Sequence, residues 1–160
     1  MRISERGLAE LILAEGSFSR VYADSGGAPT IGVGHLLTMD ERKSGQIFIG
    51  GQRYPLAPGL DDGQIRLLLM QDLLVVEECI SSLTRPLLSQ NEFDALVMLV
   101  FNIGREAFAH STLMQVIAAG NFDGVPAQFR RWVYDNGKVV KGLQNRREHE
   151  IRVWEGNYTA

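Results

Sequence analysis

The 160 residues are 45% hydrophobic and 22% charged, which suits one globular domain and excludes a disordered or fibrous chain. A formal net charge of -3 gives no overall attraction to nucleic acid or to an anionic membrane, so we expect neither as a partner. Cys79 is the only cysteine, so no intramolecular disulfide can form. The N-terminal apolar run is too short for a signal peptide, and no stretch approaches a membrane span, so we expect synthesis in the cytoplasm without stable membrane insertion.

The first predicted element is a helix that ends at about Glu15. Its apolar residues recur at helical spacing: Leu8, Leu11 and Ile12. Ser4 is placed to cap the start of this helix. Glu15 continues this apolar stripe, and Gly16 after it is typical of a helix C-cap. Because burial and the negative end of a helix both disfavour an anion, both features push the pKa of the Glu15 carboxyl upward.

A ribbon of short strands and tight turns is predicted for residues 17–33, where glycines and a proline alternate with apolar residues. This ribbon carries Asp24 and Thr30. Folded back over the end of the first helix, it would set Asp24 across a cleft from Glu15. Glycoside hydrolysis needs such a pair, because one carboxylic acid protonates the leaving oxygen while the other assists water or the developing positive charge. The hydroxyl of Thr30 is placed to orient that water.

Three further segments carry clear signals. Two apolar runs around Gly50 and Gly51 predict a hairpin over about residues 47–58. A long helix is predicted from Asp61 or Asp62 to about residue 83, ended by Thr84 and Pro86. It is apolar nearly all round, so we expect it to be central and to join two lobes. Further helices begin at a capping box at residues 89–92, at residues 111–112, at residues 125–126 and at Gly142.

Residues 128–152 hold seven Lys or Arg against three acidic residues, which is a strong local excess in an acidic chain. One interpretation is a basic face that helps to bind a polymer carrying carboxylates. The other is an ordinary solvated helix surface.

Other chemistries fit less well. Gly32 to Gly34 lacks the context of a dinucleotide fingerprint, and His35, His110 and His149 lack metal-ligand spacing. Cys79 lies on a core stripe, which disfavours a role as nucleophile. We therefore expect no metal or organic cofactor.

Several motifs in order resemble one known family. Glu15, Asp24 and Thr30 are separated by eight and five residues, and IGVGHLLT follows Thr30 directly. FNxG at residues 101–104 and GLxxRRxxE at residues 142–150 come later in the chain. Together these motifs resemble the T-even-type phage lysozymes, a glycoside hydrolase family of endolysins. The resemblance implies an α+β, lysozyme-like domain over residues 1–160: a small lobe at about 16–60, a connecting helix at about 61–83, and a helical lobe at about 84–160 plus the N-terminal helix.

The same resemblance implies an activity and a set of residues. The reaction would be hydrolysis of the peptidoglycan β-1,4 bond between N-acetylmuramic acid and N-acetylglucosamine in a cleft between the lobes, with inversion of the anomer. Glu15, Asp24 and Thr30 would be catalytic. Four residues would line the saccharide groove: Leu36, Phe101, Asn102 and Thr112. His35 would pair with Asp72 to tie the lobes together, and either Arg146 or Arg147 would pair with Glu15.

The biological setting implied is that of a phage or prophage endolysin for host lysis. Such a protein would be a monomer made in the host cytoplasm, would depend on a holin for release, and would act on bacterial peptidoglycan in the periplasm. Two other functions stay open: a lytic transglycosylase, which the presence of both Asp24 and Thr30 disfavours, and a wall-binding or tail module without catalysis. A virion-borne lysozyme or a bacterial effector would share the same sequence features.

Overall fold

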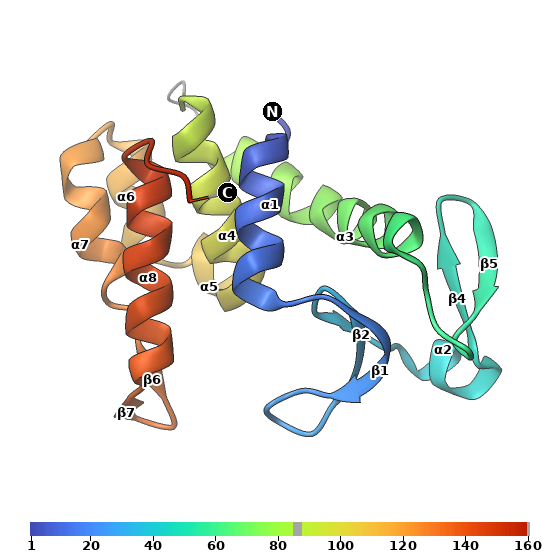
Figure 1. Ribbon diagram of the computed structural model, residues 1–160. Helices are drawn as coiled ribbons and strands as arrows, with labels where there is room; N and C mark the ends of the chain where they lie inside the picture. The colour runs from blue at the N-terminus through green and yellow to red at the C-terminus, as the bar shows by residue number, and fades with distance from the viewer. Residues whose placement is uncertain (85–87, 160) are drawn as a thin grey trace. The chain divides into compact units, whose positions relative to one another are not determined.

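The computed structural model describes residues 1–84 and 88–159, which fall into two compact units. We call residues 12–74 the sheet unit, and residues 1–11 with those from 75 onward the helical unit. Two helices, α1 (Glu5–Glu15) and α3 (Asp62–Leu83), each run from one unit into the other (Figure 1). Pro86, which we expected to help end α3, lies outside the described residues. No helix in these residues is long and apolar enough to cross a membrane.

The predicted ribbon is present in the sheet unit as three antiparallel strands in the order β1-β2-β3. They are β1 (Phe18–Ala23), β2 (Pro29–Gly32) and β3 (His35–Leu36). Thr30 in the middle strand lies opposite Tyr22 on one side and Leu36 on the other. Ile31 is fully buried, and with it the ribbon contributes to the core of the unit.

A short helix and a hairpin follow: α2 (Met39–Ser44), β4 (Gln46–Ile49) and β5 (Gln52–Pro55). The hairpin confirms the prediction for residues 47–58. Gly50 and Gly51 form its two-residue turn, both with positive φ as a tight hairpin turn requires. Helix α2 was not predicted, although Thr38 and Glu41 form a capping box that was readable in the sequence.

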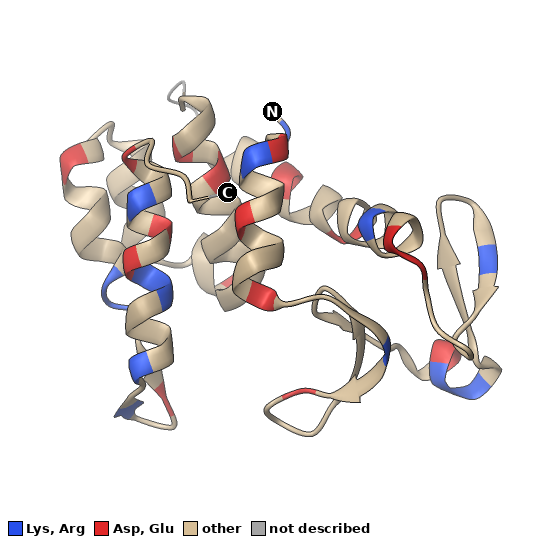
Figure 2. Ribbon diagram, viewed as in Figure 1, with Lys and Arg blue, Asp and Glu red and all other residues tan. Residues whose placement is uncertain are grey.

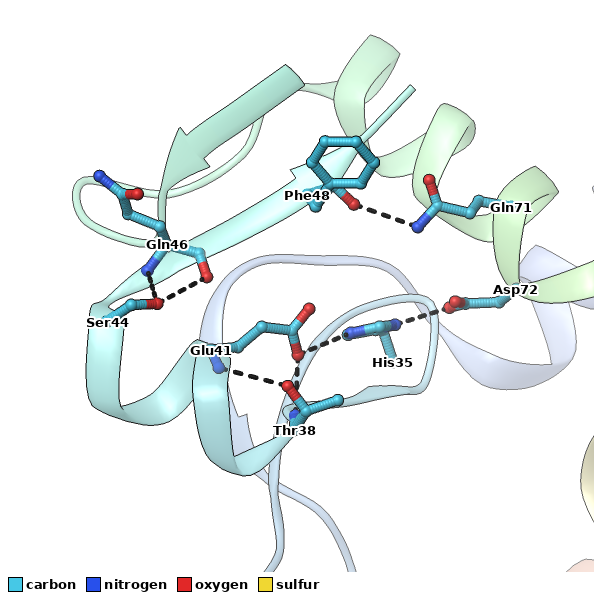
Figure 3. Close-up of polar contacts among 8 residues, drawn as sticks. All are labelled: His35, Thr38, Glu41, Ser44, Gln46, Phe48, Gln71 and Asp72. Carbon is cyan, nitrogen blue, oxygen red and sulfur yellow. Dashed lines mark hydrogen bonds and ion pairs between the residues drawn. The ribbon is translucent and has the colours of Figure 1, made fainter. Parts of the chain in front are cut away.

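Helix α3 begins as predicted, because the Asp61 carboxylate accepts a hydrogen bond from the Gln64 backbone (2.8 Å) and Gln64 returns one (2.9 Å). Its buried row is well defined: Ile65, Leu68, Leu69, Leu73, Val76 and Ile80. Its other apolar side chains are not buried, since Leu67, Met70, Leu74 and Val75 are 39–51% exposed. On the more exposed side of the helix, Gln71 donates to Phe48 O of the hairpin at 3.1 Å (Figure 3) and accepts from Gly50 N at 3.3 Å.

The helical unit is built on α4 (Gln90–Ile103), which is buried continuously over residues 93–100 and packs against α8 (Lys141–Trp154) (Figure 1). Its predicted capping box is present, with Glu92 accepting from the Ser89 backbone at 2.7 Å. The other elements are α5 (Arg105–Ala109), α6 (Thr112–Ala118), a 3₁₀ turn (Phe122–Gly124), α7 (Val125–Phe129), β6 (Tyr134–Asp135) and β7 (Lys138–Val139). The hairpin β6–β7 was not predicted, although its Asn136-Gly137 turn is a strong local signal.

A buried carboxylate fastens both chain ends to the helical unit. Asp94 in α4 is fully buried and accepts hydrogen bonds from the Ser4 backbone (2.9 Å), the Ser4 hydroxyl, Gln90 (2.8 Å) and the Tyr158 hydroxyl (2.8 Å). Gly7 is required beside it, because a Cβ there would lie 2.5 Å from the Asp94 carboxyl carbon. Burial, followed by the hydrogen bond and charge of Asp94, raises the pKa of Tyr158 to about 12.

A second buried carboxylate, Glu10 in α1, holds the end of the chain in the same way. It is fully buried and contacts His149 Nε2 at 2.5 Å and both the backbone and hydroxyl groups of Thr159. Because each oxygen has a polar partner, the carboxylate is compensated for its lost hydration. Glu10 and Asp94 therefore serve the fold of the helical unit.

Candidate active site

Glu15 is the last residue of α1 and is half-buried. The predicted C-cap is present: Gly16 has φ +79° and donates to Ile12 O at 2.9 Å. A Cβ on Gly16 would lie 3.1 Å from the ring of Phe18, so the chain turns tightly from the helix into β1. This turn presents the Glu15 side chain at the edge of the sheet unit, where part of it meets solvent.

Asp24 lies in the tight turn between β1 and β2. Its Oδ1 accepts hydrogen bonds from the backbone of Gly26 (2.9 Å) and Ala28 (2.7 Å), so one carboxylate oxygen is fixed by the turn. Within the part of the chain that the structure describes, no group donates to Oδ2. The carboxylate is therefore rigid, half-buried and able to act through its second oxygen.

Thr30 is held by the same turn. Its side chain is 2% exposed, and its hydroxyl donates to Ala28 O at 3.0 Å. The hydroxyl hydrogen is thereby used, and the oxygen keeps lone pairs that can accept from a water molecule. One residue, Ala28, thus fixes Asp24 through its N–H and Thr30 through its carbonyl.

Tyr22 is a further candidate for the site, and the sequence analysis did not single it out. It precedes Asp24 by two residues on the same strand, lies opposite Thr30, and stacks on Phe18 with ring centroids 4.3 Å apart. Burial, then the charges of Glu15 and Asp24, raise the pKa of the Tyr22 phenol against an opposing hydrogen bond with the Gly34 backbone. Both carboxylates therefore act on one neutral hydroxyl. The two-residue spacing to Asp24 was the available signal, since alternate strand residues share a face.

The predicted contact between His35 and Asp72 is present, with Nδ1 and Oδ2 2.8 Å apart (Figure 3). Glu41 lies on the other ring nitrogen at 3.3 Å, a partner that was not predicted. Burial lowers the pKa of His35, but the hydrogen bonds and charges of Asp72 and Glu41 outweigh it, so the net shift is upward. All three residues belong to the sheet unit, so the cluster fastens β3 to α2 and α3, and the expectation that it ties two lobes together was wrong.

The four predicted groove residues fall in both units. Leu36 is 57% exposed on β3 in the sheet unit. In the helical unit, Phe101 is half-buried near the end of α4, the next residue Asn102 is exposed, and Thr112 is exposed at the start of α6. Their contact with a saccharide stays a prediction.

The two arginines of α8 are both bound to Glu150. Arg147 is 1% exposed and donates to Glu150 (2.7 Å), to Trp132 O (3.1 Å) and to Asn102 Oδ1 (2.8 Å). Arg146 donates to Glu150 at 3.2 Å. Burial raises the pKa of the fully buried Glu150 carboxyl, and the two arginines oppose this only in part. Which arginine pairs with Glu15 stays a prediction.

Across residues 1–84 and 88–159, no group of three or more His, Cys, Asp or Glu side chains could hold a metal ion. The chemistry that this site offers is acid–base chemistry at two carboxyl groups with a neighbouring hydroxyl.

The family model described as phage lysozyme matches residues 13–150. The chain belongs to the phage lysozyme family. This phage lysozyme is 39% identical to the endolysin of Salmonella phage P22 over 132 aligned residues. The alignment covers 82% of this chain and 84% of that protein. It is 35% identical over 133 residues to the SAR-endolysin of Escherichia phage Mu, covering 83% and 69% respectively.

Solved structures agree with this assignment. A mutant of P22 lysozyme matches with a TM-score of 0.79 at 34% identity, over 97% of this chain and 99% of that one. The endolysin from Escherichia coli O157:H7 phage FAHEc1 matches with a TM-score of 0.82 at 30% identity, over 100% and 98%. The α+β lysozyme-like fold is confirmed, and this phage lysozyme is a glycoside hydrolase that acts on peptidoglycan.

Proposed function

We propose that the chain cleaves the β-1,4 bond between N-acetylmuramic acid and N-acetylglucosamine, with Glu15 as the general acid. The observation that carries this proposal is the anchoring of Asp24 and Thr30 by one residue, Ala28, in the same unit as Glu15. Glu15 protonates the glycosidic oxygen as the bond breaks. A half-buried carboxyl at the end of a helix suits this role, because part of its side chain stays accessible to a substrate.

Asp24 and Thr30 act on the other side of the reaction. The Thr30 oxygen accepts a hydrogen bond from the attacking water, and Asp24 Oδ2 assists the water or stabilises the developing positive charge on the sugar. Ala28 fixes both side chains, so the water is positioned relative to two anchored oxygens. Attack by this water on the face opposite to the leaving group inverts the anomer.

The remaining predicted residues support substrate binding. Leu36, Phe101, Asn102 and Thr112 contact the saccharide chain, and Arg146 or Arg147 pairs with Glu15. Residues 1–160 act as a single catalytic domain. Phe101 offers an apolar surface to a sugar ring, and the Asn102 amide keeps its N–H₂ for substrate while its oxygen is bound to Arg147.

In biological terms, we propose an endolysin that lyses the bacterial host of a phage or prophage. Relatives from Salmonella phage P22 and from the phage of an Acyrthosiphon pisum secondary endosymbiont carry the name endolysin. The protein acts as a monomer, is made in the host cytoplasm and reaches the periplasmic cell wall with the help of a holin. Expression in a Gram-negative host with and without a holin tests the last step: lysis is expected only with the holin, and lysis without it would contradict holin dependence.

Mass spectrometry of digested peptidoglycan tests the chemistry. The wild type is compared with Glu15→Gln, which keeps the side chain's shape and removes the acid, and with Glu5→Gln as a matched control in the exposed first turn of the same helix. We expect reducing muramic ends from the wild type and the control, and a loss of at least about 10³-fold with Glu15→Gln. NMR of the first products is expected to show the α anomer.

Other outcomes identify the rival functions. Anhydro-muramic ends would mean that the chain is a lytic transglycosylase. Binding to the wall without release of fragments, by wild type and variants alike, would replace the enzyme with a wall-binding module. A Glu15→Gln variant with undiminished activity would remove Glu15 from the mechanism.

A further inference from the structure

Glu150 is fully buried in the helical unit, as Glu10 and Asp94 are, but it is bound in a different way. Both oxygens of Glu10 and of Asp94 accept from distant parts of the chain. Glu150 accepts through Oε1 alone, from Arg146 (3.2 Å) and Arg147 (2.7 Å) of its own helix. In the part of the chain that the structure describes, its Oε2 has no hydrogen-bond partner. Glu150 therefore does not itself fasten distant segments together.

The buried pair of Arg147 and Glu150 is a weak source of stability. Taking two charges out of water costs free energy that their attraction does little more than offset, and an unbound carboxylate oxygen adds to the cost. Burial raises the pKa of the Glu150 carboxyl although both arginines oppose the shift, so desolvation is the larger effect. An apolar pair of similar size would serve the fold as well. The charges therefore point to a role other than stability.

The guanidinium of Arg147 is held by acceptors from three parts of the helical unit. One terminal nitrogen donates both to Glu150 (2.7 Å) and to Asn102 Oδ1, near the end of α4 (2.8 Å). The other terminal nitrogen donates to the backbone carbonyl of Trp132, which follows α7 (3.1 Å). Because a guanidinium is planar, Glu150 and the Trp132 carbonyl together fix the direction in which Arg147 donates to Asn102.

This donor fixes the orientation of the exposed Asn102 side chain. With the amide oxygen toward Arg147, a hydrogen bond forms. The reverse orientation would place the N–H₂ group against another donor, and no hydrogen bond could form. The N–H₂ group is therefore turned away from Arg147, where it can donate to a ligand.

We propose that Arg147 and Glu150 are a positioning pair for substrate binding: Glu150 aims the guanidinium, and Arg147 holds the Asn102 amide with its N–H₂ toward the saccharide. This inference rests on the proposed function, in which Asn102 contacts the glycan. A held amide donates to an acceptor oxygen of a sugar without first losing rotational freedom, which strengthens binding. The same hydrogen bond is made in the bound substrate and in the transition state, so its loss raises KM and leaves kcat nearly unchanged.

Two variants disrupt the pair in different ways. Arg147→Met combined with Glu150→Leu replaces both charges with apolar side chains, a change that buried ion pairs commonly tolerate without loss of stability. Arg147→Lys keeps the ion pair with Glu150 but lacks the planar fork that reaches both Asn102 and Trp132. Asn102→Ala removes the positioned amide itself.

Glu148→Gln is the matched control on the same helix. Figure 2 shows Asp and Glu among the Lys and Arg residues of α8, so the loss of one acidic residue there can be compared at two places. Glu148 is exposed and pairs with Arg130 at 2.7 Å, away from the buried pair. We expect its KM and kcat to match those of the wild type within about twofold.

Cleavage of soluble peptidoglycan fragments gives KM and kcat for each variant, and urea titration checks that each is folded. We expect KM to rise about fivefold to tenfold in Arg147→Lys, in the double variant and in Asn102→Ala, with kcat within about threefold of the wild type. In an Asn102→Ala background, the two pair variants are expected to cause no further rise, because the group that they position is absent. The side-chain ¹⁵N order parameter of Asn102 is expected to fall in both pair variants.

Two results would overturn the proposal. One is an unchanged KM in the folded pair variants. The other is a rise in KM that is as large in the Asn102→Ala background as in the wild type, which would show that the pair acts on binding without Asn102. Arg147→Lys, which keeps the buried ion pair, decides between these outcomes if the double variant does not fold. The proposed function is tested separately, by wild-type cleavage of the same fragments and its loss in Glu15→Gln.

Discussion

Carboxylates are used differently in the two units. In the helical unit, Asp94 and Glu10 are fully buried, and each is bound by several donors from distant parts of the chain. In the sheet unit, Glu15 and Asp24 are half-buried, and Asp24 is anchored through one oxygen only. Burial with every oxygen satisfied fixes a carboxylate for structure, whereas an accessible oxygen on a rigid support lets it take part in chemistry. This contrast predicts that the first pair controls stability and the second controls rate.

The largest expected effect on stability comes from Asp94→Ala. The change leaves donors of Ser4, Gln90 and Tyr158 without their acceptor, so we expect a loss of about 3 kcal/mol or more in the free energy of unfolding. Urea titration measures it, with Asp123→Ala at an exposed position as the control. The molecules that remain folded should keep their kcat within about twofold. A loss below about 1 kcal/mol would show that the Asp94 cluster does not hold the chain ends.

Asp24→Asn should reverse this pattern. The amide oxygen still accepts from Gly26 and Ala28, so the free energy of unfolding is expected to change by less than about 1 kcal/mol. Loss of the negative charge is expected to lower kcat about 100-fold, or about 2.7 kcal/mol in the activation free energy. Steady-state kinetics with unfolding titrations on the same preparation check both halves. Full activity in Asp24→Asn, or a large loss of stability, would contradict the division between the two units.

The smallest expected effect on stability comes from His35 and its partner Glu41, and it depends on pH. The folded pKa of His35 lies above its ordinary value of 6.5, so its stabilisation is fully present below that pH and is lost as pH rises through the folded pKa. The pKa of Glu41 is lowered: burial raises it, but hydrogen bonds from Thr38 and His35 outweigh that effect. Its contribution is therefore present above about pH 4.5 and is lost as pH falls below that value.

The free energies of unfolding of wild type and His35→Gln, measured between pH 5 and 9, test this cluster. We expect a difference of about 1 kcal/mol near pH 6 that shrinks toward pH 9. Asp72→Asn is the companion variant, because removing the partner of Nδ1 should flatten the same pH dependence. A difference that grows with rising pH would contradict the assigned direction of the His35 shift.

Local patterns in the sequence predicted the elements that carry their own signals. Ser4, Gly16, Asp61 and the Gly50-Gly51 turn all appear where capping and turn rules place them, because these interactions join residues a few positions apart. The same rules could have found α2 and the hairpin β6–β7. They could not show that one face of α3 is exposed, since an apolar helix face is covered only if other elements happen to pack on it.

What the sequence determined by itself is the chain's family and the local setting of its reactive groups: a glutamate at a helix end, an aspartate in a turn and a threonine on the next strand. Each of these depends on backbone geometry that a short segment specifies. The tertiary structure alone decided which distant groups meet. It brought His149 to Glu10, Tyr158 to Asp94, and Arg147 to Asn102. These contacts depend on how helices and strands pack across many tens of residues, and no local pattern encodes that packing.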